Sequence, residues 1–309
     1  MQRFLPKHNQ LTDNSVPQEY FVKIHGMNIH IDHYKHENPK AKIILFHGVG
    51  GNGRLLSFIA LPLQRNGFEV ICPDLPLYGY TEYFNKITYN TWVDCGIEIV
   101  THYQNQDSLK IFLFGLSAGG MLAYQVACEC CEVKGVIVTC ILDQREPVVT
   151  RKTASNPIVG TFGKRFMRPL HYCLPGLRLP MKMVSNMKRI VNNKALAKIL
   201  MSDVHSAGAY VPIRFLYTML LLQIKTEPDR FDICPFLLVH PEQDMWTDIS
   251  LSRLFYDRLA CEKELKILNG AGHFPIEPAG LKELEIYCLA FLEKNINQPS
   301  VRACPRDNH

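Results

Sequence analysis

Short apolar runs alternate with helical patterns along most of this 309-residue chain. The runs typical of buried strands are residues 41–46, 68–72, 109–114, 133–139, 234–240 and 264–269. Apolar side chains recur at helical spacing in the segments between them. This alternation predicts an α/β protein with a mostly parallel sheet and helices on both faces. Two β-rich runs around the turn at 25–28 add an N-terminal antiparallel hairpin.

The segments outside this alternation have a different character. After the sixth predicted strand, counting the hairpin, about ninety residues combine prolines with helical patterns and predict an inserted helical cap at 144–231. The sheet and its helices are then formed by residues 19–143 and 232–296. Residues 1–18 and 297–309 are polar and are expected to be flexible.

The predicted cap is the basic part of the chain. The net charge is +5, yet eleven Lys or Arg residues lie within 151–198, and residues 147–202 contain no Asp or Glu. Apolar residues are mixed with them, as in the pattern at 183–191, which predicts a helix with Met183, Val184, Met187, Ile190 and Val191 on one face. Such a surface predicts peripheral contact between 151–198 and an anionic membrane, or a substrate that carries a phosphate or carboxylate. The alternative is an ordinary solvated face. The stretch contains no recognisable nucleic-acid-binding module, so no nucleic-acid partner is expected.

Composition also bears on the compartment. No apolar stretch has the length of a signal peptide or a membrane span. Eleven cysteines in such a chain favour reduced thiols over a disulfide framework. We therefore expect a cytoplasmic protein, attached to membranes at most peripherally, whose oligomeric state stays open.

A Gly-x-Ser-x-Gly motif, with Gly115, Ser117 and Gly119, joins a strand-like run to a helical pattern. The two glycines permit a very tight turn that leaves the serine hydroxyl exposed above the sheet. The turn also places Ser117 at a helix N-terminus, where backbone N–H groups favour developing negative charge. Ser117 is therefore the predicted nucleophile.

A serine nucleophile needs a base, and the base needs a group that orients it. His273 lies in a Gly-containing loop after the last predicted strand, and Asp244 lies just beyond the strand before it. Their order along the chain, serine then acid then histidine, is known for this kind of site. Asp143, Glu242 and Asp248 are rival acids. Asp244 is preferred because a short acid a few residues past a strand suits the geometry best.

Residues 44–53 allow a second interpretation. Gly48, Gly50 and Gly53 follow a strand as Gly-x-Gly-x-x-Gly, and Asp74 ends the next strand, which is nearly a dinucleotide-binding fingerprint. A hairpin precedes the strand where that fold would begin, and the serine motif would be left unexplained. We therefore expect no nucleotide and no other cofactor.

Three histidines, His30, His33 and His36, cluster in the second strand of the hairpin. The two-residue period of a strand places His33 on the opposite face from the other two. Solvated hairpin histidines are therefore expected rather than a metal site.

Together these motifs resemble the α/β-hydrolase superfamily, over residues 19–295 apart from the inserted cap. In that superfamily a His-Gly pair after the first long parallel strand begins the loop that forms part of the oxyanion hole. Here that pair is His47 and Gly48. The resemblance implies that the backbone N–H groups of Val49 and Ala118 hold the tetrahedral oxyanion.

The run at 74–82 resembles another loop of the superfamily but has Leu77 where glycine is usual. The whole pattern is similar to the monoacylglycerol lipase and lysophospholipase branch. This resemblance implies a serine carboxylic-ester hydrolase that cleaves lipid-like esters through an acyl-enzyme on Ser117, with Asp244 orienting His273. Acyl transfer or thioester hydrolysis by the same three residues is the alternative.

Overall fold

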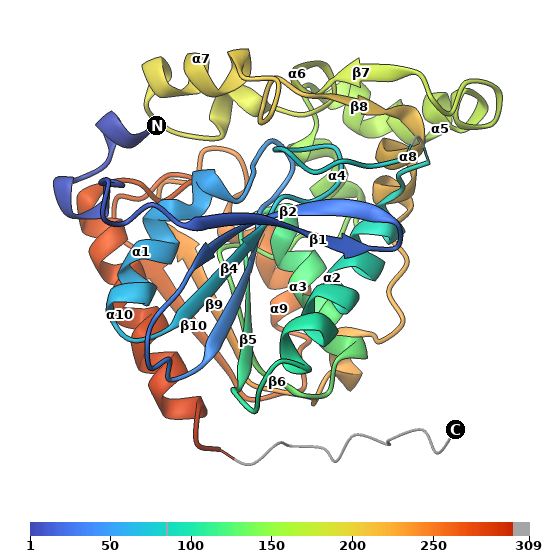
Figure 1. Cartoon of the computed structure of the whole chain (residues 1–309). Coiled ribbons are helices and arrows are strands. Elements are labelled where there is room, and N and C mark those ends of the chain that lie inside the picture. The colour runs from blue at the N-terminus through green and yellow to red at the C-terminus, as the bar shows by residue number, and fades with distance from the viewer. Residues whose placement is uncertain (85, 299–309) are drawn as a thin grey trace.

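The computed structural model describes residues 1–84 and 86–298, which form one large sheet between two layers of helices (Figure 1). The sheet order is β1-β2-β4-β3-β5-β6-β9-β10. Its strands are β1 Gln18–Ile24, β2 Met27–Tyr34, β3 Lys42–Phe46, β4 Glu69–Pro73, β5 Ile111–Gly115, β6 Val133–Val138, β9 Phe236–Pro241 and β10 Lys263–Leu268. The β1–β2 and β2–β4 pairs are antiparallel and the other pairs are parallel. The predicted hairpin and mostly parallel sheet are thus confirmed.

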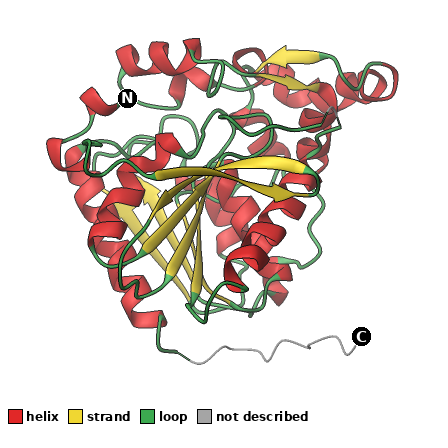
Figure 2. Cartoon of the chain, viewed as in Figure 1, coloured by secondary structure: helices red, strands yellow, loops and turns green. Residues whose placement is uncertain are grey.

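The central strands lie in the core of the molecule. Every residue of β3, β5, β6 and β9 is buried, because helices cover both faces of a parallel sheet. On one face lie α1 and α10, and on the other α2, α3 and α9 (Figures 1 and 2). The bounds are α1 Ser57–Arg65, α2 Tyr89–Gln104, α3 Ala118–Glu129, α9 Ile249–Tyr256 and α10 Pro278–Asn295. Of the predicted flexible tail, residues 299–309 lie outside the described residues.

A helical cap follows β6 and covers the edge of the sheet where the parallel strands end (Figure 1). Its helices are α4 Pro147–Thr153, α5 Pro157–Cys173, α6 Met181–Val184, α7 Lys194–Ser202 and α8 Ile213–Leu221. This confirms the predicted insertion after the sixth strand. The cap also holds a short antiparallel ribbon that was not predicted, β7 Arg178–Pro180 with β8 Tyr210–Pro212. None of the helices in the described ranges is long and apolar enough to cross a bilayer.

The prediction of one helix over 183–191 is wrong. The helix α6 ends at Val184, and a separate 3-10 turn, η4 Met187–Arg189, follows it. The backbone of Ser185 is extended because it pairs as a β-bridge with the segment after α4. Met183 consequently points outward and is 62% exposed. Periodicity could not show this break because the bridge partner lies about thirty residues away.

The first residues of the chain pack against α1. Two 3-10 turns, Gln2–Phe4 and Lys7–Asn9, flank the buried side chain of Leu5. The amide of Gln2 donates a 3.0 Å hydrogen bond to the hydroxyl of Ser57, at the start of α1. The N-terminal segment expected to be flexible therefore has defined contacts with the core.

Candidate active site

Ser117 stands in the turn between β5 and α3. Its backbone angles are φ 57° and ψ −126°, a conformation that non-glycine residues rarely adopt. Close packing imposes this turn. A Cβ on Gly115 would lie 2.1 Å from the carbonyl oxygen of Gly119, and a Cβ on Gly119 would lie 2.3 Å from that of Phe46. The N–H of Ser117 donates to Oγ1 of Thr139 at 3.2 Å, which satisfies a buried donor inside the turn.

Two hydrogen bonds connect Ser117, His273 and Asp244. The Nε2 atom of His273 lies 2.8 Å from Oγ of Ser117, and its Nδ1 lies 2.7 Å from Oδ2 of Asp244. All three residues are buried. A carboxylate only accepts, so Nδ1 carries the imidazole proton and Nε2 is left free to accept the serine proton. The three predicted residues, from three different loops, therefore meet in space.

Additional donors hold the carboxylate of Asp244 in place. The backbone N–H groups of Trp246 and Thr247 both donate to its Oδ1 at 2.8 Å, and the Thr247 hydroxyl donates to Oδ2 at 2.7 Å. Burial acts to raise the pKa of Asp244, but the adjacent His273 and the bonds from Thr247 hold that pKa well below its usual value. Thr247 was not predicted, although aspartate side chains commonly accept hydrogen bonds from residues two or three positions further along the chain.

The rival acids have other partners. Asp143 is buried and forms an ion pair with Arg145 at 2.7 Å. Asp248 caps the N-terminus of α9, and Glu242 accepts a backbone N–H from the loop after β10. Within the described residues, Asp244 is the carboxylate that is hydrogen-bonded to His273.

His47 orients the loop that follows β3. Its Nε2 accepts the N–H of Leu75 at 2.9 Å, so its Nδ1 carries the proton and donates to the carbonyl of Gly48 at 2.8 Å. The N–H of Gly51 donates to the same oxygen at 3.0 Å. Because a trans peptide is planar, the N–H of Val49 points away from that carbonyl. Burial lowers the pKa of His47, which keeps the ring neutral as this arrangement requires.

This loop lies directly against the serine turn. A Cβ on Gly48 would be 2.8 Å from Cβ of Ser117 and 3.0 Å from the backbone nitrogen of Ala118. Val49, Ser117 and Ala118 line one pocket. The two residues expected to supply oxyanion donors are therefore close to the serine hydroxyl.

Asp74, which a dinucleotide site would use to hold a ribose, is instead bonded to neighbouring loops. Its carboxylate accepts the N–H of Gly53 at 2.6 Å and the N–H of Tyr80 at 2.9 Å, and it contacts Nδ1 of His30 at 2.8 Å. A Cβ on Gly79 would overlap this carboxylate. Both carboxylate oxygens of Asp74 are therefore occupied by bonds to neighbouring segments of the chain. Asp74 is thus not placed to bind a ribose, as a dinucleotide site would require.

Leu77 takes the conformation of the glycine that it replaces. Its φ is 87°, in the left-handed region that costs a residue with a side chain about 1 kcal/mol or more. The side chain is buried in the core, and that burial offsets the cost. The loop thus keeps its turn without the usual glycine.

The prediction that the hairpin histidines are solvated is wrong for His30 and His33, which are both buried. The ring of His33 bonds Oε1 of Glu69 through Nε2 at 2.5 Å and the hydroxyl of Tyr20 through Nδ1 at 2.7 Å. The reason is that aromatic rings cover both faces of the strand: Tyr20 and Tyr103 pack against His33, and Phe21 and Tyr80 pack against His30.

A possible metal-binding group lies in the same region. Glu19, His30 and Asp32 place their ligand atoms within 4.8 Å of one another. The guanidinium of Arg54 contacts both carboxylates and lies 2.6 Å from Oδ1 of Asp32. Arg54 therefore already supplies the positive charge that these two acids need.

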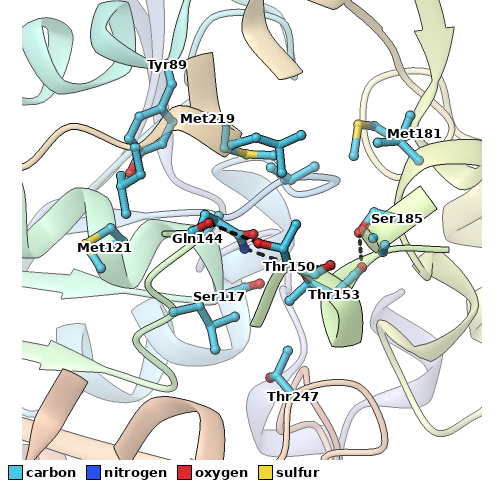
Figure 3. Close-up of a pocket in the computed structure, with 18 of the residues that line it drawn as sticks. Tyr89, Ser117, Met121, Gln144, Thr150, Thr153, Met181, Ser185, Met219 and Thr247 are labelled. Carbon is cyan, nitrogen blue, oxygen red and sulfur yellow. Dashed lines mark hydrogen bonds between the residues drawn. The ribbon is translucent and has the colours of Figure 1, made fainter. Parts of the chain in front are cut away.

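A pocket lies between the core and the cap, with Ser117 in its wall (Figure 3). Most of its surface is apolar. The apolar residues come from both parts of the chain and include Val49, Met121, Leu142, Met167, Met181, Val184, Met219, Leu220, Leu222 and Trp246. The described residues that line this pocket include no Asp, Glu, Lys or Arg.

The hydroxyl groups on the cap side of the pocket are bonded to backbone carbonyls. Thr150 donates to the carbonyl of Gln144 at 3.0 Å and Ser185 to that of Thr153 at 2.9 Å (Figure 3). Thr153 donates to the carbonyl of Val149 at 3.0 Å. Their protons are therefore already used within the protein. The pocket thus offers an uncharged and largely apolar surface next to Ser117.

Comparison with solved structures shows the same fold. A soluble variant of monoglyceride lipase from Saccharomyces cerevisiae, in complex with a substrate analog, aligns with a TM-score of 0.74 at 19% identity, over 95% of this chain and 99% of that chain. Monoacylglycerol lipase from Paleococcus ferrophilus aligns with a TM-score of 0.67 at 22% identity, over 86% and 99%. A thermophilic esterase from Thermogutta terrifontis aligns with a TM-score of 0.61 at 19% identity, over 90% and 99%.

Comparison by sequence finds one protein family and no individual curated protein. No curated protein matches the chain significantly. Residues 37–277 match the family model described as serine aminopeptidase, S33. The matched residues include most of the core and the whole cap. The chain therefore belongs to the serine aminopeptidase S33 family of α/β-hydrolases.

Proposed function

We propose that the protein is a serine carboxylic-ester hydrolase that cleaves uncharged, lipid-like acyl esters. The observation that carries this proposal is the pair of hydrogen bonds from Ser117 through His273 to Asp244, at the wall of an uncharged pocket. A serine hydroxyl is a weak nucleophile at neutral pH, and this arrangement activates it.

The reaction proceeds in two halves. The Nε2 atom of His273 takes the proton of Ser117 as its oxygen attacks the ester carbonyl, and the N–H groups of Val49 and Ala118 stabilise the resulting oxyanion. His273 then protonates the leaving alcohol, and the acyl group stays on Ser117. Water, deprotonated by His273, attacks the acyl-enzyme. The bond between the acyl carbon and Oγ of Ser117 then breaks, His273 returns the proton to Oγ, and the carboxylic acid is released. Asp244 stays ionised throughout and stabilises the imidazolium that forms in each half.

The lining of the pocket favours a neutral substrate. An aminopeptidase must hold the ammonium group of a free N-terminus, and a lysophospholipid or a phosphorylated thioester carries anionic groups. Burying either charge without a partner is costly. The described lining offers no charged partner, so a neutral ester suits this pocket better than these alternatives. No feature of the site favours acyl transfer over hydrolysis.

We also propose that the basic segment 151–198 contacts anionic membranes through α5. Ile158, Phe162 and Phe166 recur on one side of this helix and are 70%, 46% and 65% exposed. The segment carries eleven Lys or Arg residues, each of which gains about 1 kcal/mol near an anionic bilayer. Val159 and Met167 of the same helix line the pocket, so a lipid surface at α5 would lie close to the site.

The experiment is a comparison of the wild type with Ser117→Ala on three substrates: a neutral monoacyl ester, a lysophospholipid and an aminoacyl arylamide. We expect hydrolysis of the neutral ester to be fastest and to fall by about 10⁴-fold or more in the variant, which keeps the circular dichroism spectrum of the wild type. Ester hydrolysis that survives the substitution would refute the serine mechanism. Faster cleavage of the arylamide would refute the proposed substrate class.

A further inference from the structure

A six-residue part of the cap, 187–192, lies across the loops that carry the site. We call it the clamp segment. It comprises the turn η4 and the three residues that lead to α7. Met187, Ile190 and Val191 are almost completely buried, so the segment is firmly seated.

The clamp segment holds the loop of Asp244 at two points. The guanidinium of Arg189 donates a short hydrogen bond to the carbonyl of Met245. The amide of Asn192 donates to the carbonyl of Gln243 at 3.1 Å. These carbonyls belong to the residues on either side of Asp244, so the two bonds fix the backbone from which its carboxylate extends.

The same segment holds the loop of His273. The N–H of Phe274 donates to the carbonyl of Ile190 at 3.0 Å. On the other side of the histidine, Gly272 packs against Asn192, since a Cβ there would be 2.7 Å from the side-chain amide. The clamp segment therefore touches both neighbours of His273 as well as both neighbours of Asp244.

The loop of Val49 is the third contact. Gly50, with φ 82°, approaches Met187 so closely that a Cβ there would lie 3.0 Å from its sulfur. One short piece of the cap thus contacts the loops of the base, the acid and an oxyanion donor. A residue in another part of the cap gives a further link to the acid loop. The indole N–H of Trp246, in the acid loop, donates to the carbonyl of Thr153, at the end of α4, at 3.2 Å.

We infer that the clamp segment positions the catalytic residues, so that this part of the cap acts on the chemical step and not only on substrate binding. The inference rests on the proposed function. Asn192 is its main positioning residue because it contacts both the acid loop and the histidine loop. A displacement of about 1 Å between reacting groups lowers the rate by up to about 100-fold.

The test compares Asn192→Ala with Asn193→Ala. The two asparagines are adjacent, but the Asn193 side chain caps α7 by accepting from the N–H groups of Ala195 and Leu196. On a soluble short-chain ester we expect Asn192→Ala to lower kcat about 10-fold with KM unchanged within about twofold. Asn193→Ala should lower the melting temperature through loss of its cap and leave kcat unchanged.

A spectroscopic readout keeps the test independent of turnover. We expect the proton between Nδ1 of His273 and Asp244 to give a far-downfield NMR resonance, because the two groups form a short hydrogen bond of 2.7 Å. This resonance should shift or broaden in Asn192→Ala and stay in place in Asn193→Ala. If Asn192→Ala keeps both the wild-type kcat and the wild-type resonance, the inference is refuted. If the wild type cleaves no ester, the proposed function fails, and the resonance alone decides whether the segment positions the pair.

Discussion

The glycines of the serine turn and two glycines in the outer part of the cap, Gly163 and Gly176, have opposite surroundings. At the serine turn, a methyl group on Gly115 or Gly119 would come within 2.1 and 2.3 Å of a backbone oxygen. In α5, a methyl group on Gly163 would have its nearest neighbour at 4.0 Å, and one on Gly176, between α5 and β7, would have none within 4 Å. The core around Ser117 is thus built from backbone in direct contact with backbone, whereas this part of the cap has room.

This difference explains why one region has a recognisable motif and the other does not. Where a Cβ would lie only 2–3 Å from backbone atoms, glycine alone fits, so the turn can be recognised from a short sequence motif. The clamp segment shows that the cap is not loose throughout, because Met187 and Asn192 contact the catalytic loops closely. The cap therefore has a tight inner part, and it has room at Gly163 and Gly176, whereas Gly160 at the start of α5 packs closely against α4.

The largest expected effect concerns the acid in the core. We expect Asp244→Asn to lower kcat by about 10⁴-fold, because the amide can neither stabilise the imidazolium nor keep the proton on Nδ1 of His273. Asp248→Asn is the matched control, since asparagine also caps helices well. Its kcat on the same ester should match the wild type. Equal losses in the two variants would remove Asp244 from its proposed role.

The same methyl group should have opposite effects in the two regions. Gly119→Ala should lower the free energy of unfolding by about 3 kcal/mol or more, because the atom that it meets is a strand carbonyl that cannot move aside. Gly163→Ala, in the interior of α5, should raise it by about 0.5–1 kcal/mol. Urea denaturation of both variants measures these values. Destabilisation by Gly163→Ala would show that the cap is packed as tightly as the core.

Binding to anionic vesicles can be compared between variants of the outer face of α5 and a variant of the core surface. Phe162→Ser with Phe166→Ser should weaken binding to anionic vesicles about 10-fold, since two exposed aromatic side chains lose their burial in lipid. Hydrolysis of a soluble ester should not change. Phe21→Ser is the control, because Phe21 is 52% exposed and belongs to the hairpin and not to the cap. Equal weakening by the control in a sedimentation assay would contradict the proposed membrane face.

The smallest effect is a pH dependence of stability. The folded state holds the pKa of Asp244 below the value of 3.8 that is usual for this group, so its carboxylate stabilises the fold above that pH, and this contribution is lost as the pH falls. Relative to Asp244→Asn, the wild type should lose about 1 kcal/mol of unfolding free energy between pH 5 and about pH 3. Chemical denaturation at several pH values measures the difference. A constant difference would show that Asp244 is not held in a favourable ionised state.

Local sequence patterns were sufficient to predict the strands and the reacting residues of the core, because each of these features depends on a few neighbouring residues. The six predicted runs overlap the observed strands to within two residues, since buried parallel strands are continuous apolar runs between turns. Ser117, Asp244 and His273 each follow a strand, and the ends of parallel strands meet at one edge of the sheet. Their meeting could therefore be expected from chain order alone.

The features that the sequence did not reveal depend on partners far along the chain. The break at Ser185 depends on a bridge to Ala154, and the burial of His33 depends on Glu69 and the strand β4. No local pattern marks Asn192 as a neighbour of the acid loop 51 positions away.

The layered fold, the tight serine turn and the chain order of the three reacting residues could be inferred from the chain alone, because tight turns and strand ends are properties of short segments. The folded structure was needed to show which carboxylate contacts His273, that the described lining of the pocket beside Ser117 is uncharged, and that the clamp segment holds the loops around it. The physical reason is that hydrogen bonds between loops and the lining of a pocket depend on how distant segments pack, and that packing carries no periodic signal along the chain.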